Sequence, residues 1–303
     1  MPRNRLNELA ARVNARLETL LPEEMEGVFA DGGRPWLVNN AMRYSLMAGG
    51  KRLRPAMLLA AAEMLGGDAE IALDYGCAAE MIHTYSLIHD DLPGMDDDAL
   101  RRGRPTNHVI YGVGQAILAG DGLLNMAFEV MLAAAERAAG NHRALIAAAR
   151  EIADGAGARG MVGGQSMDLF FERSGGAGED ALLYIHENKT ARMFIHPLRA
   201  AALISGADQA ALDALTRFGA AFGALFQATD DLLDVLGDTK ELGKSVGKDE
   251  AADKLTCVKL YGVEGARALA VRLRDEAVSA LGCFGDGAAF FAELSVEMVD
   301  RTM

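Results

Sequence analysis

Two groups of aspartates are the first residues in this chain whose type and spacing could do chemistry. The segment "DDLPGMDDD" (90–98) places five aspartates within nine positions, and "DDLLD" (230–234) adds three more. Close carboxylates repel one another, so a cation is expected to compensate them. Oxygen ligands favour a hard cation, and the sequence therefore predicts Mg²⁺ whose coordination is completed by the phosphates of a substrate.

Two plainer interpretations compete with this one. Calcium is an alternative cation, but the EF-hand spacing with its central Gly and terminal Glu is absent from the sequence. A solvated acidic helix face is the other alternative. At about 100° per residue, however, the face that carries Gln227 and the second cluster holds only small residues upstream: Ala220, Gly223 and Ala224. Small residues in place of Lys or Glu indicate the floor of a cavity with a cation site at its mouth.

The first cluster has the same layout. A helix is expected over residues 73–91, and its face on the side of Asp90 carries small or polar residues: Gly76, Ala79, His83 and Ser86. Pro93 ends this helix because it cannot continue the backbone hydrogen bonds. The aspartates at 96–98 are therefore expected on a turn that folds back beside Asp90.

Two short basic segments complement the acids. "GGKRLRP" (49–55) and "RRGRP" (101–105) contain six of the 30 Lys and Arg residues of the chain. Arg is suited to bidentate contact with phosphate, and Lys to contact as a point charge. Each segment alone could be a solvated patch. Together with the aspartates they predict two phosphate sites, one neutralised through metal and the other bound directly by cations.

The bulk properties narrow the class of protein. The chain has 303 residues and a net charge of -13, which argues against nucleic acid or an acidic membrane as the main partner. Three widely spaced cysteines without a CxxC motif indicate a reducing compartment. The N-terminal segment is not typical of a signal peptide, and no uncharged apolar run approaches the roughly 20 residues of a membrane span. We therefore expect a cytoplasmic protein with no membrane partner.

The elements that must position these side chains are expected to be helices throughout. Ala, Leu and Met recur at helical spacing in segment after segment, while alternating runs of Val, Ile and Thr are nearly absent. No repeat of fixed period and no long linker interrupts the pattern. The sequence predicts one all-α domain over residues 1–303, with about ten or more helices around a central apolar cavity. Several helices are apolar nearly all round, which favours burial by other helices or by a second subunit.

The order of the motifs resembles a known family. "GGKRLRP", "EMIHTYSLIHDDLPGMDDDALRRGRPTNH", "GGQSMDL", "HENKTARMF" and "FQATDDLLDVLGDTKELGKSVGKD" follow one another along the chain. In this order they are similar to the motifs of trans-isoprenyl diphosphate synthases, above all those of bacterial-type farnesyl diphosphate synthases. The resemblance implies an all-α fold around a deep cavity, a homodimer, and two aspartate motifs that face each other across the cavity mouth.

The resemblance also implies a role for individual residues. Six aspartates would hold about three Mg²⁺ ions on an allylic diphosphate: Asp90, Asp91, Asp96, Asp230, Asp231 and Asp234. The residues around that substrate would be Arg101, Lys189, Thr190, Gln227 and Lys244. The diphosphate of isopentenyl diphosphate would be bound by Lys51, Arg54, His83 and Arg102.

The implied reaction is that of a prenyltransferase. Diphosphate leaves the allylic substrate, the double bond of isopentenyl diphosphate attacks the resulting carbocation, and a proton is lost. Thr190 and Gln227 are hypothesised to stabilise the cation with their oxygens. In the enzymes that the chain resembles, an aromatic residue five positions before the first motif, here Tyr85 next to Ser86, together with a first motif two residues longer goes with a fifteen-carbon farnesyl product. A twenty-carbon geranylgeranyl product is the alternative. An ideal helix places Tyr85 about 140° from Asp90, so the sequence does not put its ring in the cavity.

Some positions depart from the family pattern, and other functions compete. Asp253-Lys254 stands where the family often has Gly-Lys, which leaves the role of Lys254 open. Arg301 stands near the end of the chain, where relatives often have a basic group close to the active site. His89 is expected to be a packed residue rather than a base.

Three other functions compete with this one. A terpene cyclase would not need the basic segments, and a non-catalytic partner subunit would have lost motif residues. An acidic cation buffer would leave the basic loops unexplained.

Overall fold

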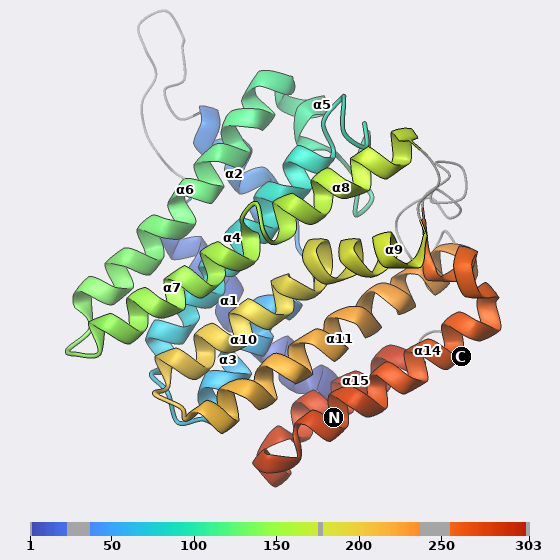
Figure 1. Ribbon diagram of the computed structural model, residues 1–303. Helices are drawn as coiled ribbons and strands as arrows, with labels where there is room; N and C mark the ends of the chain where they lie inside the picture. Colours follow the sequence, from blue (N-terminus) through green and yellow to red (C-terminus); the bar gives the residue numbers. More distant parts are fainter. Residues whose placement is uncertain (1, 23–36, 175–177, 237–254, 301–303) are drawn as a thin grey trace, which may run out of the picture.

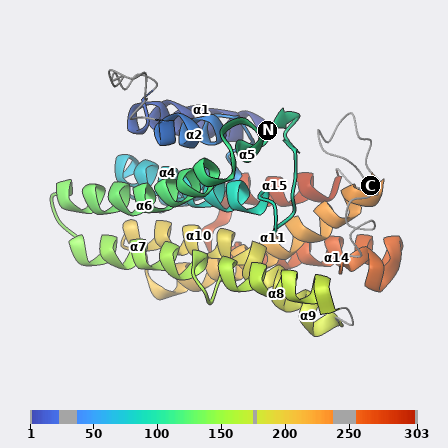
Figure 2. The same cartoon turned by 90° about the horizontal axis from the view of Figure 1, so that it is seen from above.

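A computed structural model of the chain describes residues 2–22, 37–174, 178–236 and 255–300, and within them the architecture is almost wholly helical. Long helices lie side by side in successive layers (Figures 1 and 2). Figure 2 shows α1 (Pro2–Leu20) and α2 (Leu37–Leu46) on one side and α4 (Ala69–Asp90) and α6 (Val113–Arg137) next to them. Beyond these lie α7 (His142–Ala156), α8 (Met161–Ser174) and α10 (Arg192–Ile204). The prediction of an all-α fold with ten or more helices is confirmed.

The remaining elements precede or follow α4 along the chain. The helix α3 (Leu53–Met64) precedes α4, and after α4 come α5 (Asn107–Tyr111), α7 (His142–Ala156), α8 (Met161–Ser174) and α9 (Glu179–Ile185). The chain then forms a π-helical turn, η1 (His186–Ala191), which runs directly into α10 (Arg192–Ile204). The C-terminal part consists of α11 (Gln209–Leu236), α14 (Cys257–Ala280), the 3₁₀ segment η2 (Gly282–Ala288) and α15 (Ala289–Asp300).

The helix that ends in the first aspartate cluster is buried over most of its length. It begins at Ala69, four residues before the expected start, because Asp68 caps it by accepting hydrogen bonds from the N–H groups of Glu70 and Ile71. Its central residues are enclosed on all sides by α3, α6 and α10. A helix that is apolar all round needs such enclosure, and α4 thereby becomes the central helix of the molecule.

One strand pair was not expected from the sequence. Among the described residues, β1 (Leu100–Arg101) and β2 (Arg104–Pro105) pair in antiparallel fashion around a tight turn. At the turn Arg102 has a φ of 54° and Gly103 a φ of 73°. This hairpin folds the second basic segment back on itself and holds it next to the first aspartate cluster.

The helix α6 is long and strongly apolar. By length and apolarity alone, it is the single continuous helix in the described part of the chain that could cross a membrane, and α14 with η2–α15 would qualify only as a pair bent by 94°. In the structure α6 packs against α2, α4 and α7. Its outward side exposes apolar residues, among them Leu118 and Leu132.

Candidate active site

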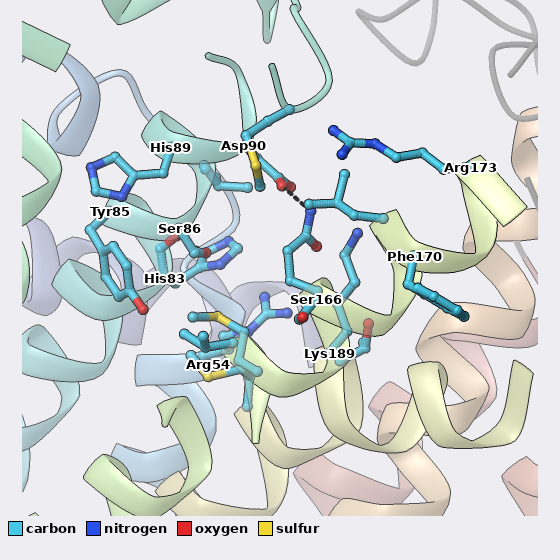
Figure 3. Close-up of a pocket in the computed structure, with 18 of the residues that line it drawn as sticks. Arg54, His83, Tyr85, Ser86, His89, Asp90, Ser166, Phe170, Arg173 and Lys189 are labelled. Atoms are coloured by element: carbon cyan, nitrogen blue, oxygen red, sulfur yellow. Dashed lines mark hydrogen bonds between the residues drawn. The ribbon is translucent and has the colours of Figure 1, made fainter. Parts of the chain in front are cut away.

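A cavity of about 850 Å³ lies between α4, α8, η1 and the start of α10, with Arg54 of α3 at its inner end. Its volume lies within the range of about 300–1,000 Å³ that is usual for small-molecule sites. Figure 3 shows Asp90, Lys189 and Arg173 with their charged ends turned toward the same space. The structure brings seven of the residues predicted from the sequence into this lining: Arg54, His83, Tyr85, Ser86, Asp90, Lys189 and Thr190.

The first aspartate cluster folds as its Pro-Gly break predicts. The helix α4 ends at Asp90, and the N–H of Asp96 donates to the backbone oxygen of Asp90 at 2.9 Å, so the chain doubles back beside the helix end. The side chains then diverge. Asp90 lines the cavity, whereas Asp91 is buried and accepts both hydrogen bonds from Nε of Arg101, at 2.8 and 2.9 Å. The two adjacent carboxylates therefore have different partners.

The helix α8 supplies two polar residues that sequence reasoning missed. Gln165 donates to Oδ1 of Asp90 at 2.6 Å (dashed in Figure 3), and Asp168 accepts from Nζ of Lys189 at 2.6 Å. Both belong to "GGQSMDL", one of the ordered motifs that carry the family resemblance. The available signal was their spacing, because residues three apart lie on one face of a helix.

The π-helical turn η1 is held between two glycines. A Cβ at Gly164 of α8 would lie 2.2 Å from the backbone nitrogen of Lys189, and one at Gly223 of α11 would lie 2.4 Å from Cα of Ala191. Both helices can thus approach the backbone of the turn closely. This places Thr190 beside α11, where its hydroxyl donates to Oε1 of Gln227 at 2.8 Å. π-helical turns of this kind are frequent at functional sites.

The second aspartate cluster also divides into different environments. Asp231 is buried and accepts from Nε2 of Gln227 at 2.9 Å and from the N–H of Cys257 at 2.8 Å. Asp234 is buried as well, while Asp230 is partly exposed. Burial lowers the pKa of Arg54, and the negative charge of Asp230 offsets a small part of that shift, so these two side chains lie within electrostatic reach of each other. Asp230 is the member of the cluster that is least buried.

The inner end of the cavity is cationic and poorly solvated. The guanidinium of Arg54 lies 4.5 Å from the ring centroid of Phe194 and 5.7 Å from that of Phe226, an arrangement typical of cation–π contact. Burial lowers the pKa of Arg54 to about 10. Its Nε is buried and finds no hydrogen-bond acceptor among the described residues. A buried donor without an acceptor is costly, so this position suits an anionic ligand.

His83 lies next to this cation. Burial lowers its pKa well below the usual value, and the charges of Arg54 and Arg102 lower it further. The imidazole is consequently neutral at pH 7, able to donate one hydrogen bond and accept another.

The first basic segment is held by two arginines that point in different directions. Arg52 has a left-handed φ of 49°, and its guanidinium is buried against Glu80 at 2.7 Å and the backbone oxygen of Leu46 at 2.6 Å. Arg102, from the hairpin, donates to the backbone oxygen of Gly49. A Cβ at Gly50 would lie 2.5 Å from that guanidinium, so the glycine makes room for it. Lys51 is exposed between these anchors.

The chemistry of these residues fits a hard divalent cation, but the side chains do not form a complete coordination shell by themselves. Within the described ranges no three His, Cys, Asp or Glu side chains are gathered as metal ligands. Mg²⁺ is commonly bound through one or two carboxylates while phosphates and water supply the rest. Asp90, which lines the cavity on α4, and Asp230, on α11, are two carboxylates that could meet that requirement. Of the other predicted positions, Lys244, Lys254 and Arg301 lie outside the described residues.

The sequence matches one family model. Residues 35–278 match the model described as polyprenyl synthetase. Geranylgeranyl pyrophosphate synthase 9 from the chloroplast of Arabidopsis thaliana is 43% identical over 270 residues, which are 88% of this chain and 72% of that protein.

Two solved structures are similar over nearly their full length. An FPP/GFPP synthase from Zymomonas mobilis has a TM-score of 0.85 and 32% identity, with 99% of this chain and 100% of that chain covered. A geranyltransferase from Helicobacter pylori, solved with magnesium and isoprenyl diphosphate, has a TM-score of 0.80 and 30% identity, with coverages of 97% and 96%. The likeness extends over the fold that surrounds the cavity.

Proposed function

This chain belongs to the polyprenyl synthetase family, and from that premise we propose that it is a short-chain trans-prenyl diphosphate synthase whose substrates are isopentenyl diphosphate and an allylic diphosphate. The observation that carries the proposal is the cavity itself. It has a carboxylate and a lysine, Asp90 and Lys189, at one part of its lining, and a buried cation, Arg54, with an unpartnered donor at another. One apolar space bordered by two phosphate-binding regions suits the joining of two diphosphate esters.

The metal-binding role is divided among the aspartates in this proposal. Asp90 and Asp230 would hold Mg²⁺, with Asp96 and Asp234 beside them, and the ion would supply charge compensation for diphosphate as it leaves. Asp91 and Asp231 already accept hydrogen bonds from Arg101 and Gln227, respectively. Their role is then to orient those side chains toward the allylic substrate.

The two diphosphates would be bound by different side chains. Lys189 and Arg101 lie near the first cluster and would neutralise the allylic diphosphate, while Arg54, His83 and Arg102 would bind that of isopentenyl diphosphate together with Lys51. Nε of Arg54 would gain the acceptor that it lacks. Neutral His83 would donate a single hydrogen bond to a diphosphate oxygen.

The apolar cavity walls would exclude water from the reacting carbocation. The C–O bond of the allylic substrate breaks and diphosphate leaves with the electron pair. The double bond of isopentenyl diphosphate then forms the new C–C bond, and the product cation transfers a proton to the released diphosphate. Met161, Val162, Leu169 and Phe170 line the cavity with apolar surface and would keep water from quenching the cation. The oxygens of Thr190 and Gln227 would stabilise its charge.

The product is proposed to have twenty carbons. This differs from the fifteen-carbon product expected first from Tyr85, because the relative that matches at 43% identity over most of the chain is named as a geranylgeranyl synthase. A farnesyl product remains the second candidate, since Tyr85 does line the cavity although an ideal helix did not place it there. The two products differ only in where chain growth stops.

A product assay tests both parts of the proposal. The protein is incubated with isopentenyl diphosphate, Mg²⁺ and dimethylallyl, geranyl or farnesyl diphosphate, and the dephosphorylated products are separated by chromatography. Chain growth that ends at twenty carbons and stops when EDTA is added is expected. Absence of growth from every starter would contradict the function, and accumulation of fifteen carbons would contradict only the length.

Two variants, one of them a control, test the metal-binding role of Asp90 in the same assay. Asp90→Asn should lower turnover by about 100-fold or more, because a ligand position for the ion is lost. Asp154→Asn is the matched control, since Asp154 lies on the surface in an exposed pair with Arg150. Equal turnover of the two variants would contradict the metal-binding role of Asp90.

A further inference from the structure

One wall of the cavity is formed by two rings from α4. Tyr85 and His89 both line the cavity, and their ring centroids are 5.8 Å apart with an interplanar angle of 82°, so the rings meet edge to face. Tyr85 is only 7% exposed. Behind the two rings lies α6, and none of the described cavity-lining residues belongs to that helix. The two rings therefore separate the cavity from α6.

His89 is fixed to α6 rather than to the charged part of the cavity. Its Nε2 lies 3.0 Å from the backbone oxygen of Ile117, and because a carbonyl oxygen only accepts, Nε2 carries the proton in this contact. Figure 3 shows the imidazole projecting away from the carboxylate of Asp90 and over the ring of Tyr85. This orientation does not suit a base that acts at the diphosphates.

The helix α6 has a recess that receives the imidazole. A Cβ at Gly120 would lie 2.1 Å from Nε2 of His89, nearer than any real side chain would allow. Only the missing side chain at Gly120 lets the imidazole reach the carbonyl of Ile117. The imidazole is thus held in one position. Its edge-to-face contact with Tyr85 in turn limits where the phenol ring can lie.

We propose that His89 is a specificity-determining residue, which holds Tyr85 as a partition and so sets the length at which the product chain stops growing. This inference rests on the proposed prenyl diphosphate synthase function. A chain that grows inside an apolar cavity is limited by the first rigid obstacle on its path. Tyr85 supplies the obstacle, and the ring of His89, seated in the recess at Gly120, supplies the rigidity. Without the imidazole, the phenol ring can turn into the space vacated in front of Gly120.

Three variants separate the ring of His89 from its hydrogen bond. His89→Ala removes both, His89→Gln keeps a donor without the ring, and His89→Phe keeps a ring without the donor. His142→Ala is the matched control, because His142 contacts the backbone oxygen of Ala135 at 2.7 Å outside the cavity. The readout is the ratio of longer to shorter products, which a loss of stability alone would not change.

We expect His89→Ala to raise the ratio of products longer than the wild-type product by at least about tenfold, since each additional buried methylene favours binding about fourfold. His89→Gln should behave in the same way, and His89→Phe should stay within about threefold of the wild type. An unchanged ratio in His89→Ala, or an equal change in His142→Ala, would overturn the proposal.

A second measurement does not depend on turnover. Calorimetry with saturated twenty- and twenty-five-carbon alkyl diphosphates, which lie on either side of the proposed stopping length, compares the affinities of the wild type and His89→Ala. The variant should favour the longer chain by at least about tenfold relative to the wild type, and an unchanged preference, including no binding by either protein, would overturn the inference. Failure of the proposed function has a different signature, which is absence of chain growth by the wild type with every starter.

Discussion

At the scale of a single residue, Gln165 orients the carboxylate of Asp90 in the cavity wall. Its amide donates to Asp90, and the neighbouring Asp168 accepts from Lys189, so α8 orients one acidic and one basic partner at once. Groups that orient metal-binding carboxylates commonly matter nearly as much as the ligands themselves.

We predict that Gln165→Leu lowers kcat/KM for the allylic diphosphate by about 10- to 100-fold, because Asp90 loses the donor that orients it. Steady-state kinetics at saturating isopentenyl diphosphate measure the effect. Gln209→Leu is the matched control, since Gln209 donates to Asp213 at 2.7 Å on the exposed surface. Indistinguishable kinetics of the two variants would count against an orienting role.

At the scale of elements, the basic loop depends on a buried ion pair. Arg52 and Glu80 are almost completely enclosed, and together they join the loop before α3 to the middle of α4. His83 lies three residues after Glu80 on the same helix, and Arg54 lies two residues after Arg52. The ion pair therefore fixes the position of this loop relative to His83.

Glu80→Gln should destabilise the protein by about 3–5 kcal/mol in urea unfolding, because Arg52 keeps a buried and uncompensated charge. The double variant Arg52→Met/Glu80→Leu should recover most of that stability. We expect it still to bind isopentenyl diphosphate at least about tenfold more weakly, since the loop is no longer anchored.

Glu276→Gln is the control for this pair, because Glu276 meets Arg272 at 3.8 Å on the exposed surface. It should change stability by less than about 1 kcal/mol. A double variant that binds isopentenyl diphosphate as the wild type does would show that the pair serves stability alone.

A second interhelical contact makes stability depend on pH. Glu151 of α7 accepts hydrogen bonds from Nδ1 of His196 at 2.9 Å and from Nε and Nη2 of Arg199 at 2.8 Å, both on α10. Burial raises the pKa of Glu151, but these hydrogen bonds outweigh it and lower the pKa from 4.5 to about 2. The carboxylate thus stabilises the fold above its unfolded pKa.

Glu151→Gln should cost on the order of 3 kcal/mol in the free energy of unfolding at pH 7. Because the folded pKa is depressed, this contribution is lost as the pH falls from about 4.5 toward 2, so the difference from the wild type should narrow there. Urea unfolding at a series of pH values measures it. Glu264→Gln, at an exposed pair with Arg267, should show a small difference at every pH, and a pH-independent gap for Glu151→Gln would contradict the assignment.

At the scale of the whole molecule, the outer face of α5 and α6 is the place where a second copy is expected. Val109, Ile110, Val113, Leu118 and Leu132 are exposed on these two adjacent helices. Apolar side chains gathered on one face of a monomer are typical of an interaction surface. The expected homodimer would cover them and would add a layer next to α6, the helix that holds His89.

Leu118→Glu should shift the protein from dimer to monomer in sedimentation or light scattering, because a charge would be buried at the interface. Leu183→Glu is the control, since Leu183 on α9 is exposed to a similar degree, 55% against 51%. A monomeric wild type, or a Leu118→Glu protein that dimerises as well as the control, would contradict this surface.

The sequence by itself determined the helical class and the neighbourhood of the first motif. Helical periodicity and the scarcity of strand patterns are local properties, and the break at Pro93 follows from the chemistry of one residue. The return of Asp96 to Asp90 could therefore be predicted. The two-residue strands around Arg102 were missed, because so short a hairpin has no periodic pattern.

Only the tertiary structure decided what each carboxylate and ring contacts. Asp90 and Asp91 are neighbours in the sequence, yet one faces the cavity and the other is bonded to Arg101. Tyr85 reaches the cavity wall although an ideal helix points it about 140° from Asp90, because a cavity surrounds more of a helix than one narrow face. The recess at Gly120 that receives His89 belongs to α6, about thirty residues further along. Such contacts depend on which helices pack together, and no local pattern in the chain encodes that choice.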